Sequence, residues 1–115
     1  VGVRSATAAA LNAGGRRLLQ LAARELARKG AAVVIACRSA ERGKAALEAL
    51  KVDVPGGTFD LVQLDVSSLA SVRKCAEEFS QRADAKLDVL INNAGIMMLP
   101  KRELSSDGFE LQFAT

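Results

Sequence analysis

The chain contains three short apolar runs, at residues 31–37, 59–64 and 87–91. Each is too short for an independent helix. The first is unbroken and rich in β-branched residues, which is typical of an interior parallel strand, and the third ends abruptly in two amides and a glycine. We therefore predict three strands, the first and the third of them buried.

A helix is predicted before the first strand, because apolar residues recur there at spacings of three and four. The stripe runs through residues 16–29 and includes Leu19 and Ala23, and Gly30 then supplies a stop. Residues 1–15 show neither an alternation nor a helical stripe. We predict that they are irregular.

Two further helices are predicted between the strands. The first begins at Ser39 and ends before a Pro-Gly-Gly turn at residues 55–57. Ser67 or Ser68 can cap the second. Its apolar positions recur at three and four residues, as expected for one buried face; they are Val72, Cys75, Ala76 and Phe79.

A last helix is predicted to begin near the carboxyl end, where Asp107 and Glu110 have the spacing of a capping pair. From residue 16 onward the order is helix, strand, helix, strand, helix, strand, with connections long enough for right-handed crossovers. This order predicts an α/β fold, a doubly wound parallel sheet with helices on both faces. The 115 residues suffice for a single domain.

Composition narrows the classes of function. The chain is 50% hydrophobic with four Phe and no Trp or Tyr, so Ala, Val, Leu and Ile must build the core. Its net charge of +3 comes from basic residues that alternate with acids along predicted helices, which is typical of solvated faces. Without aromatic platforms we expect no nucleic-acid partner. No run reaches the roughly 18 apolar residues of a transmembrane segment.

The two cysteines, Cys37 and Cys75, share no metal-ligand spacing. Each falls within an apolar pattern, so we predict buried, reduced thiols and no metal site. The first thirty residues show no signal-peptide layout. The sequence predicts no particular compartment.

Polar residues follow each predicted strand at its carboxyl end, where an open α/β sheet binds its ligand. Arg38 and Ser39 follow the first strand. A site that prefers NAD usually has a carboxylate at this position, whereas a guanidinium suits a 2′-phosphate. Arg38 therefore favours NADP; the alternative is an ordinary surface arginine at a helix start.

Asp65 ends the second strand, and two roles suit its carboxylate equally well. It could accept a hydrogen bond from an adenine amino group, or cap the helix that follows. The third strand ends in Asn92, Asn93, Ala94 and Gly95. The glycine allows close approach of the backbone to a ligand, and the amides can bridge to a ribose or to a neighbouring strand.

Four segments, in this order, resemble the short-chain dehydrogenase/reductase family, and most closely its retinol dehydrogenase-like branch. They are VVIACRSAERGKAALEAL, LVQLDVSSLASVRKCAEEF, LDVLINNAGIMM and DGFELQFAT. The resemblance covers residues 22–115. It implies that residues 1–115 form a single, incomplete NAD(P)-binding domain of the Rossmann type.

By this resemblance, seven residues would bind NADPH at the carboxyl edge of the sheet. Arg38 would meet the 2′-phosphate, with Ser39 near it. The others would line the adenine site and the cofactor ribose; they are Asp65 and Val66 for adenine, and Asn93, Ala94 and Gly95 for the ribose. Asn92 would have a structural role.

Two departures from the family pattern concern the phosphate turn and the catalytic residues. Asn12-Ala13-Gly14-Gly15 stands where a dinucleotide fold has its glycine-rich phosphate turn, but only two adjacent glycines occur there. Counting back from Gly30 places Ala13, Arg17 and Leu19 where the family has three glycines, and bulky Arg or Leu side chains there would obstruct a pyrophosphate. If Gly14 is instead the second of the three, about three residues are inserted and the third glycine is still missing. The family's catalytic Asn would follow Thr115, with its Ser and Tyr-x-x-x-Lys further on. We expect no catalytic residue in this chain and no activity from it alone.

The resemblance implies that the parent protein transfers hydride between a nicotinamide cofactor and a small hydrophobic alcohol or carbonyl substrate. The alternative is a non-catalytic, truncated or degenerate remnant that acts, if at all, through binding. The sequence does not identify the substrate or the oligomeric state.

Overall fold

The computed structural model describes residues 6–11, 16–82 and 86–115, and only the backbone of residues 6–11 and 16. Four parallel strands form one sheet in the order β3-β2-β1-β4. They are β1 (Ala6–Leu11), β2 (Ala32–Cys37), β3 (Thr58–Gln63) and β4 (Leu87–Ile91). This architecture confirms the predicted α/β fold.

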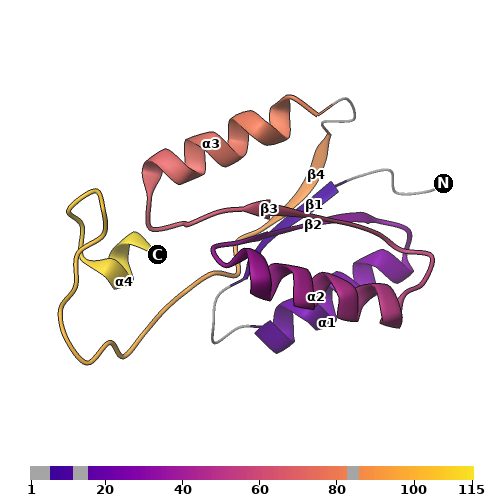
Figure 1. The fold of residues 1–115 in the computed structure, drawn as a ribbon, viewed down its shortest axis with the longest axis horizontal. Helices are drawn as coiled ribbons and strands as arrows, with labels where there is room; N and C mark the ends of the chain where they lie inside the picture. Colours follow the sequence, from indigo (N-terminus) through magenta and orange to yellow (C-terminus); the bar gives the residue numbers. More distant parts are fainter. Residues whose placement is uncertain (1–5, 12–15, 83–85) are drawn as a thin grey trace.

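Helices lie on both faces of the sheet (Figure 1). Helices α1 (Arg16–Arg28) and α2 (Ala40–Asp53) cover one face, and α3 (Leu69–Ser80) lies over the other. A short helix, α4 (Leu111–Ala114), lies near the carboxyl end of the chain. The longest of the described helices has 14 residues, and none of them is long and apolar enough to cross a membrane.

Strand β1 lies inside the sheet, which contradicts, for residues 6–11, the prediction that residues 1–15 are irregular. Its sequence, ATAAAL, has a weak intrinsic preference for strands because alanine is depleted in them. Parallel pairing with β2 along its whole length and with β4 over residues 6–9 supplies its hydrogen bonds. Tertiary pairing therefore determines this strand, and no local pattern reveals it.

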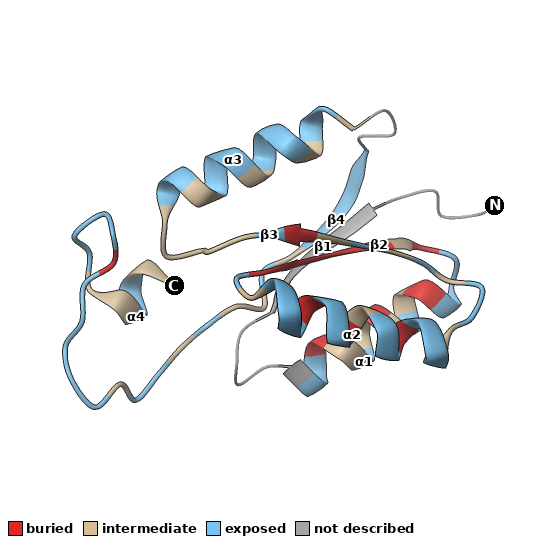
Figure 2. Ribbon diagram, viewed as in Figure 1, coloured by how far each residue is buried: buried red, intermediate tan, exposed pale blue. Residues whose placement is uncertain are grey.

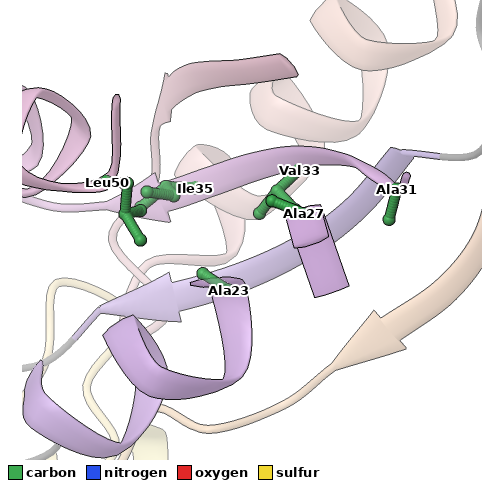
Figure 3. Close-up of a cluster of buried hydrophobic side chains, with 6 residues drawn as sticks. All are labelled: Ala23, Ala27, Ala31, Val33, Ile35 and Leu50. Carbon is green, nitrogen blue, oxygen red and sulfur yellow. The ribbon is translucent and has the colours of Figure 1, made fainter. Parts of the chain in front are cut away.

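The main core lies between β2 and the helices α1 and α2. Residues 33–37 of β2 are all buried, as the unbroken apolar run predicts. One cluster joins the strand to both helices, with small alanines where α1 approaches; it consists of Ala23, Ala27, Ala31, Val33, Ile35 and Leu50 (Figure 3). Figure 2 shows buried residues gathered on this side.

The face beneath α3 is only partly packed. Cys75 and Phe79, from the predicted apolar stripe, contact a small cluster of Val34, Ala36 and Val62. No residue of α3 is buried, and an apolar cavity of about 640 Å³ lies between this helix and the sheet. The helix is thus amphipathic as predicted, but its apolar face is not fully covered.

Strand β4 is confirmed, but the prediction that it is buried is wrong. Leu87, Val89 and Leu90 are 43%, 46% and 57% exposed. Among the described residues β4 pairs only with β1, so it forms an edge of the sheet, and side chains on both of its faces reach solvent (Figure 2).

Side chains at three helix starts satisfy backbone N–H groups. Ser39 Oγ accepts from the N–H of Arg42 at 3.3 Å, so this serine caps α2 as predicted. Ser68 rather than Ser67 caps α3, since its Oγ accepts from the N–H of Ser71 at 3.3 Å.

The predicted capping pair near the carboxyl end is half right. Glu110 caps α4 by accepting from the N–H groups of Gln112 and Phe113 at 3.1 and 3.0 Å, and these bonds lower the pKa of its carboxyl group. Asp107 makes no capping hydrogen bond to α4 among the described residues. Its Oδ2 accepts from the N–H of Leu69 at 2.8 Å, at the start of α3.

Two adjacent leucines of α1 test the assignment of the core. Leu19 is 2% exposed and Leu18 is 66% exposed. Leu19→Ala should lower the free energy of unfolding by about 2–5 kcal/mol, because it removes buried apolar area and leaves a cavity. Leu18→Ala should change it by less than about 0.5 kcal/mol. Urea denaturation followed by circular dichroism measures both, and equal losses would contradict the placement of Leu19.

Candidate functional site

The carboxyl ends of the parallel strands meet at one edge of the sheet. β1 has β2 on one side and β4 on the other, so the strand order reverses at this point. Open α/β sheets bind their ligands outside such a reversal. Figure 1 shows the start of α3 and the 104–115 segment on the same side of the molecule, at the left.

Arg38 follows β2 directly and is exposed. The sheet register pairs Cys37 with Gln63, and Gln63 Nε2 donates to the carbonyl oxygen of Arg38 at 3.4 Å. This bond ties the Arg38 backbone to the end of β3. The guanidinium itself makes no ion pair or hydrogen bond with any residue that the structure describes. An unpaired cation therefore stands at the edge where a ligand is expected.

A cavity of about 290 Å³ joins Arg38 to the end of β3 and the first turns of α3. Its lining is mostly polar and consists of Arg38, Gln63, Asp65, Ala70, Ser71, Lys74 and Glu78. Two of the sequence-predicted site residues, Arg38 and Asp65, are thus brought together.

The hydrogen bonds of Asp65 bear on one of its two predicted roles, that of helix cap. Its Oδ1 accepts from the backbone N–H of Ser67 at 3.0 Å and from the Ser67 hydroxyl at 2.6 Å, which forms an Asx turn. Ser68, not Asp65, caps α3. Within the described ranges Asp65 Oδ2 accepts no hydrogen bond, so it is available to a ligand.

Ser71 fixes the backbone at the same turn. Its Oγ accepts from the N–H of Asp65 at 2.9 Å, which couples the end of β3 to the first turn of α3. The orientation of the Asp65 carboxylate therefore depends on the position of that helix turn.

The remaining predicted residues lie apart from this cavity. Ser39 Oγ acts as the α2 cap, which leaves its O–H free to donate. Val66 is half-buried and lines the apolar cavity beneath α3 together with Asn92. Ala94 is half-buried at the end of β4 and lines neither cavity.

Asn93 and Gly95 have features that packing within the described residues does not explain. Asn93 Nδ2 is buried and has no hydrogen-bond partner there. Such an orphaned donor costs about 1–3 kcal/mol unless an acceptor meets it. A Cβ added to Gly95 would meet no described atom within 4 Å, so steric contact with the protein does not require glycine. Both features suit a polar ligand that approaches the backbone closely.

The predicted phosphate turn, residues 12–15, lies outside the described residues. Ala13, which takes the place of the first glycine of the family pattern, also lies outside the described residues. Of the other two counted positions, Arg17 is exposed and Leu19 is buried in the interior. Of these two side chains only that of Arg17 reaches solvent, so the predicted obstruction of a pyrophosphate would come from Arg17.

The sequence patterns do not single out Gln63 or Ser71, and they assign Asp107 to the last helix rather than to α3. Gln63 could be found from the parallel register, since it lies opposite Cys37. Ser71 lies three residues after a capping serine, a spacing that places it in the first turn. Asp107 contacts a residue 38 positions away, and no local signal marks such a bond.

Comparisons with known proteins are consistent with this geometry. Residues 10–115 match the family model described as short chain dehydrogenase. Retinol dehydrogenase 12 of Mus musculus is 44% identical over 91 residues, which make up 79% of this chain and 28% of that protein. The chain spans less than a third of the length of the curated relatives that it matches.

Solved structures share the fold. An uncharacterised protein from Mycobacterium Paratuberculosis has a TM-score of 0.77 and 37% identity, over 99% of this chain and 37% of that chain. An actinorhodin polyketide ketoreductase with NADPH has a TM-score of 0.65 and 25% identity, over 81% of this chain and 34% of that one. The sheet and helices described above are therefore those of a known class of oxidoreductase structures.

The two thiols are both free. Cys37, next to Arg38, is buried, and Cys75 is half-buried, so the prediction of burial holds fully only for Cys37. Burial raises the pKa of both, and the nearby Glu78 carboxylate raises that of Cys75 further. Because folding raises these pKa values, the unfolded state loses its thiol protons at a lower pH than the folded state does. The free energy of unfolding therefore keeps its full value below the ordinary thiol pKa of 9.0 and falls as the pH rises from there through the raised pKa.

At pH 8, both thiols should react with iodoacetamide more slowly than free cysteine, because a raised pKa lowers the thiolate fraction. Cys37, which is 3% exposed, should be the slower of the two. Timed labelling followed by peptide mass spectrometry measures the rates, and urea should abolish the difference. A folded-state rate for Cys37 equal to that of Cys75 would disprove its burial at the end of β2.

Proposed function

This chain belongs to the short-chain dehydrogenase family, and on that premise we propose that it forms the cofactor-binding part of an NADP-dependent oxidoreductase. The family uses nicotinamide cofactors, and one similar structure contains NADPH. The parent protein would transfer hydride between the nicotinamide and a small hydrophobic alcohol or carbonyl compound.

One observation carries the choice of NADP over NAD. The Arg38 guanidinium, at the end of β2, is exposed and unpaired among the described residues, and it lines the same cavity as Asp65. A planar guanidinium can bind two phosphate oxygens at once, and its charge is permanent. No carboxylate follows β2 directly, since the first acid after it in the sequence is Glu41. The two acids in the cavity lining, Asp65 and Glu78, come from the end of β3 and from α3, and Lys74 lines the same cavity.

Other groups at the edge suit the rest of the adenosine half. Asp65 Oδ2 would accept from the adenine amino group, while Ser67 holds the opposite oxygen in the Asx turn. The Nδ2 of Asn93, unpaired among the described residues, would donate to a ribose oxygen. A Cβ at Gly95 would meet no described atom within 4 Å, so the sugar could approach the backbone there. Ser39 and Val66 would flank the phosphate and the adenine ring, and Ala94 the ribose.

The chain's own contribution is to bind and orient the cofactor, which when bound supplies or accepts the hydride. Proton transfer to the substrate oxygen needs a positioned acid–base group whose pKa lies near the working pH. The chain contains no Tyr and no His. We therefore propose that it binds the cofactor without turning over substrate by itself.

Replacing Arg38 with Ala should weaken NADPH binding roughly tenfold to a hundredfold, the loss of about 1.5–3 kcal/mol from one charge-assisted contact. NADH, which lacks the 2′-phosphate, should be little affected. Arg73→Ala is the matched control, because Arg73 is exposed on α3 and does not line the cavity. Fluorescence titration of the protein with each cofactor measures the affinities.

The outcomes separate the proposals. Equal losses for NADPH and NADH would reject the role of Arg38 while leaving a cofactor site in place. Failure of the unsubstituted protein to bind either cofactor at millimolar concentration would reject cofactor binding itself. That second result would favour the alternative, a non-catalytic remnant.

A further inference from the structure

The loop of residues 103–111 is linked to the start of α3 by one long-range hydrogen bond. Asp107 Oδ2 accepts from the backbone N–H of Leu69 at 2.8 Å, across 38 positions of sequence. The other described capping side chains, Ser39, Ser68 and Glu110, bond only to residues two or three positions away. Asp107 is thus the described cap that joins two distant segments.

The loop presents Asp107 through its own hydrogen bonds. Ser105 is 8% exposed, and its Oγ accepts from the N–H groups of Asp107 and Phe109, each at 3.3 Å. Its backbone N–H donates to the carbonyl oxygen of Phe109 at 2.7 Å, and its carbonyl accepts from Gly108 at 3.0 Å. Gly108 has φ +81°, which a glycine adopts without strain. The position of the carboxylate is therefore fixed by the loop rather than by a flexible tail.

Helix α3 depends on such contacts at its ends, because its packing on the sheet is incomplete. It has no buried residue, and the apolar cavity lies beneath it. Just beyond its carboxyl end, Arg82 forms an ion pair with Asp60 of β3 at 2.6 Å. At its amino end, Leu69 is bonded to Asp107. Polar contacts near both ends thus supplement the packing of a loosely packed helix.

The amino end of α3 is also the end that orients Asp65. Ser71, in the first turn, accepts from the Asp65 N–H, and the Asx turn of Asp65 and Ser67 leads directly into the helix. Any movement of this turn would displace the carboxylate that lines the Arg38 cavity. A negative charge beside the first N–H groups of a helix is also electrostatically favourable.

We propose that Asp107 is a positioning residue for cofactor binding: by holding the first turn of α3, its carboxylate sets the orientation of Asp65 at the adenine end of the nucleotide. This inference rests on the cofactor site proposed above. It assigns to the 103–111 loop a role at the adenosine half, through α3 and without contact with the reacting atoms.

The test compares Asp107→Ala, Asp107→Asn and Asp60→Ala in the protein. The probe is 2′,5′-ADP, which carries only the adenosine half with its 2′-phosphate, and NADPH is titrated in parallel. Asp107→Ala should weaken both by about threefold to tenfold, the usual range for loss of a cap. Asp107→Asn keeps an acceptor oxygen and should restore most of the affinity. Asp60→Ala removes the ion pair at the far end of α3 and the bond from the N–H of Leu61 to Asp60 Oδ1. Neither Asp60 nor Leu61 lines the Arg38 cavity, so binding should be unchanged.

Amide hydrogen exchange supplies a readout that does not depend on the ligand. Exchange at Leu69 and Ser71 should be faster in Asp107→Ala than in Asp107→Asn, while exchange within α2 stays the same. Unchanged exchange would overturn the tether. Faster exchange with unchanged 2′,5′-ADP affinity, or an equal loss in Asp60→Ala, would overturn the positioning role while the cofactor site stands. If the unsubstituted protein binds neither probe, the proposed function fails and this role fails with it.

Discussion

The pairing of β1 with β2 on one side and β4 on the other is the constraint on which the rest of the structure depends. It aligns four parallel strands so that their carboxyl ends share one edge, and it creates the reversal of strand order at that edge. Without β1, the end of β4 with its Asn93 and Gly95 would have no fixed relation to Arg38 at the end of β2. The candidate site is therefore a product of topology, since its residues follow three different strands, β2, β3 and β4.

The two faces of the sheet contribute unequally. On one face, alanines of α1 and the buried Leu50 of α2 pack closely against β2, so burial of apolar surface holds the layers together. On the other face, α3 lies above an incompletely filled apolar cavity, and polar contacts at its two ends supplement the packing. The candidate cofactor edge lies between the closely packed face and the incompletely packed face of the sheet. A rigid strand carries Arg38 to the edge, whereas the position of Asp65 depends on hydrogen bonds around the start of α3.

Much of this arrangement could be predicted from sequence, because hydrophobic periodicity records which side of an element favours burial. The helix predicted at residues 16–29 and the strand at 87–91 occur within one residue of those limits, and Ser39 caps the helix that it was expected to begin. β1 could not be predicted, since its alanines show no pattern and its strand state comes from its neighbours. The burial of β4 was predicted wrongly because an apolar sequence shows a preference for burial but not whether another segment covers the strand. Likewise, no pattern within a short stretch of the sequence could predict the hydrogen bond between Asp107 and Leu69, which lie 38 positions apart.

Above all, we propose that the carboxyl edge of this sheet binds the adenosine half of NADPH through Arg38, Asp65 and the residues after β4. Titrating the isotope-labelled protein with NADPH while recording its amide NMR spectrum tests this claim directly. We predict saturable shifts at Arg38, at Asp65 and its neighbour Val66, and at residues 93–95, with little change at the exposed Gly56 in the turn after α2. Shifts confined to other surfaces, or a spectrum that does not change at millimolar NADPH, would contradict it.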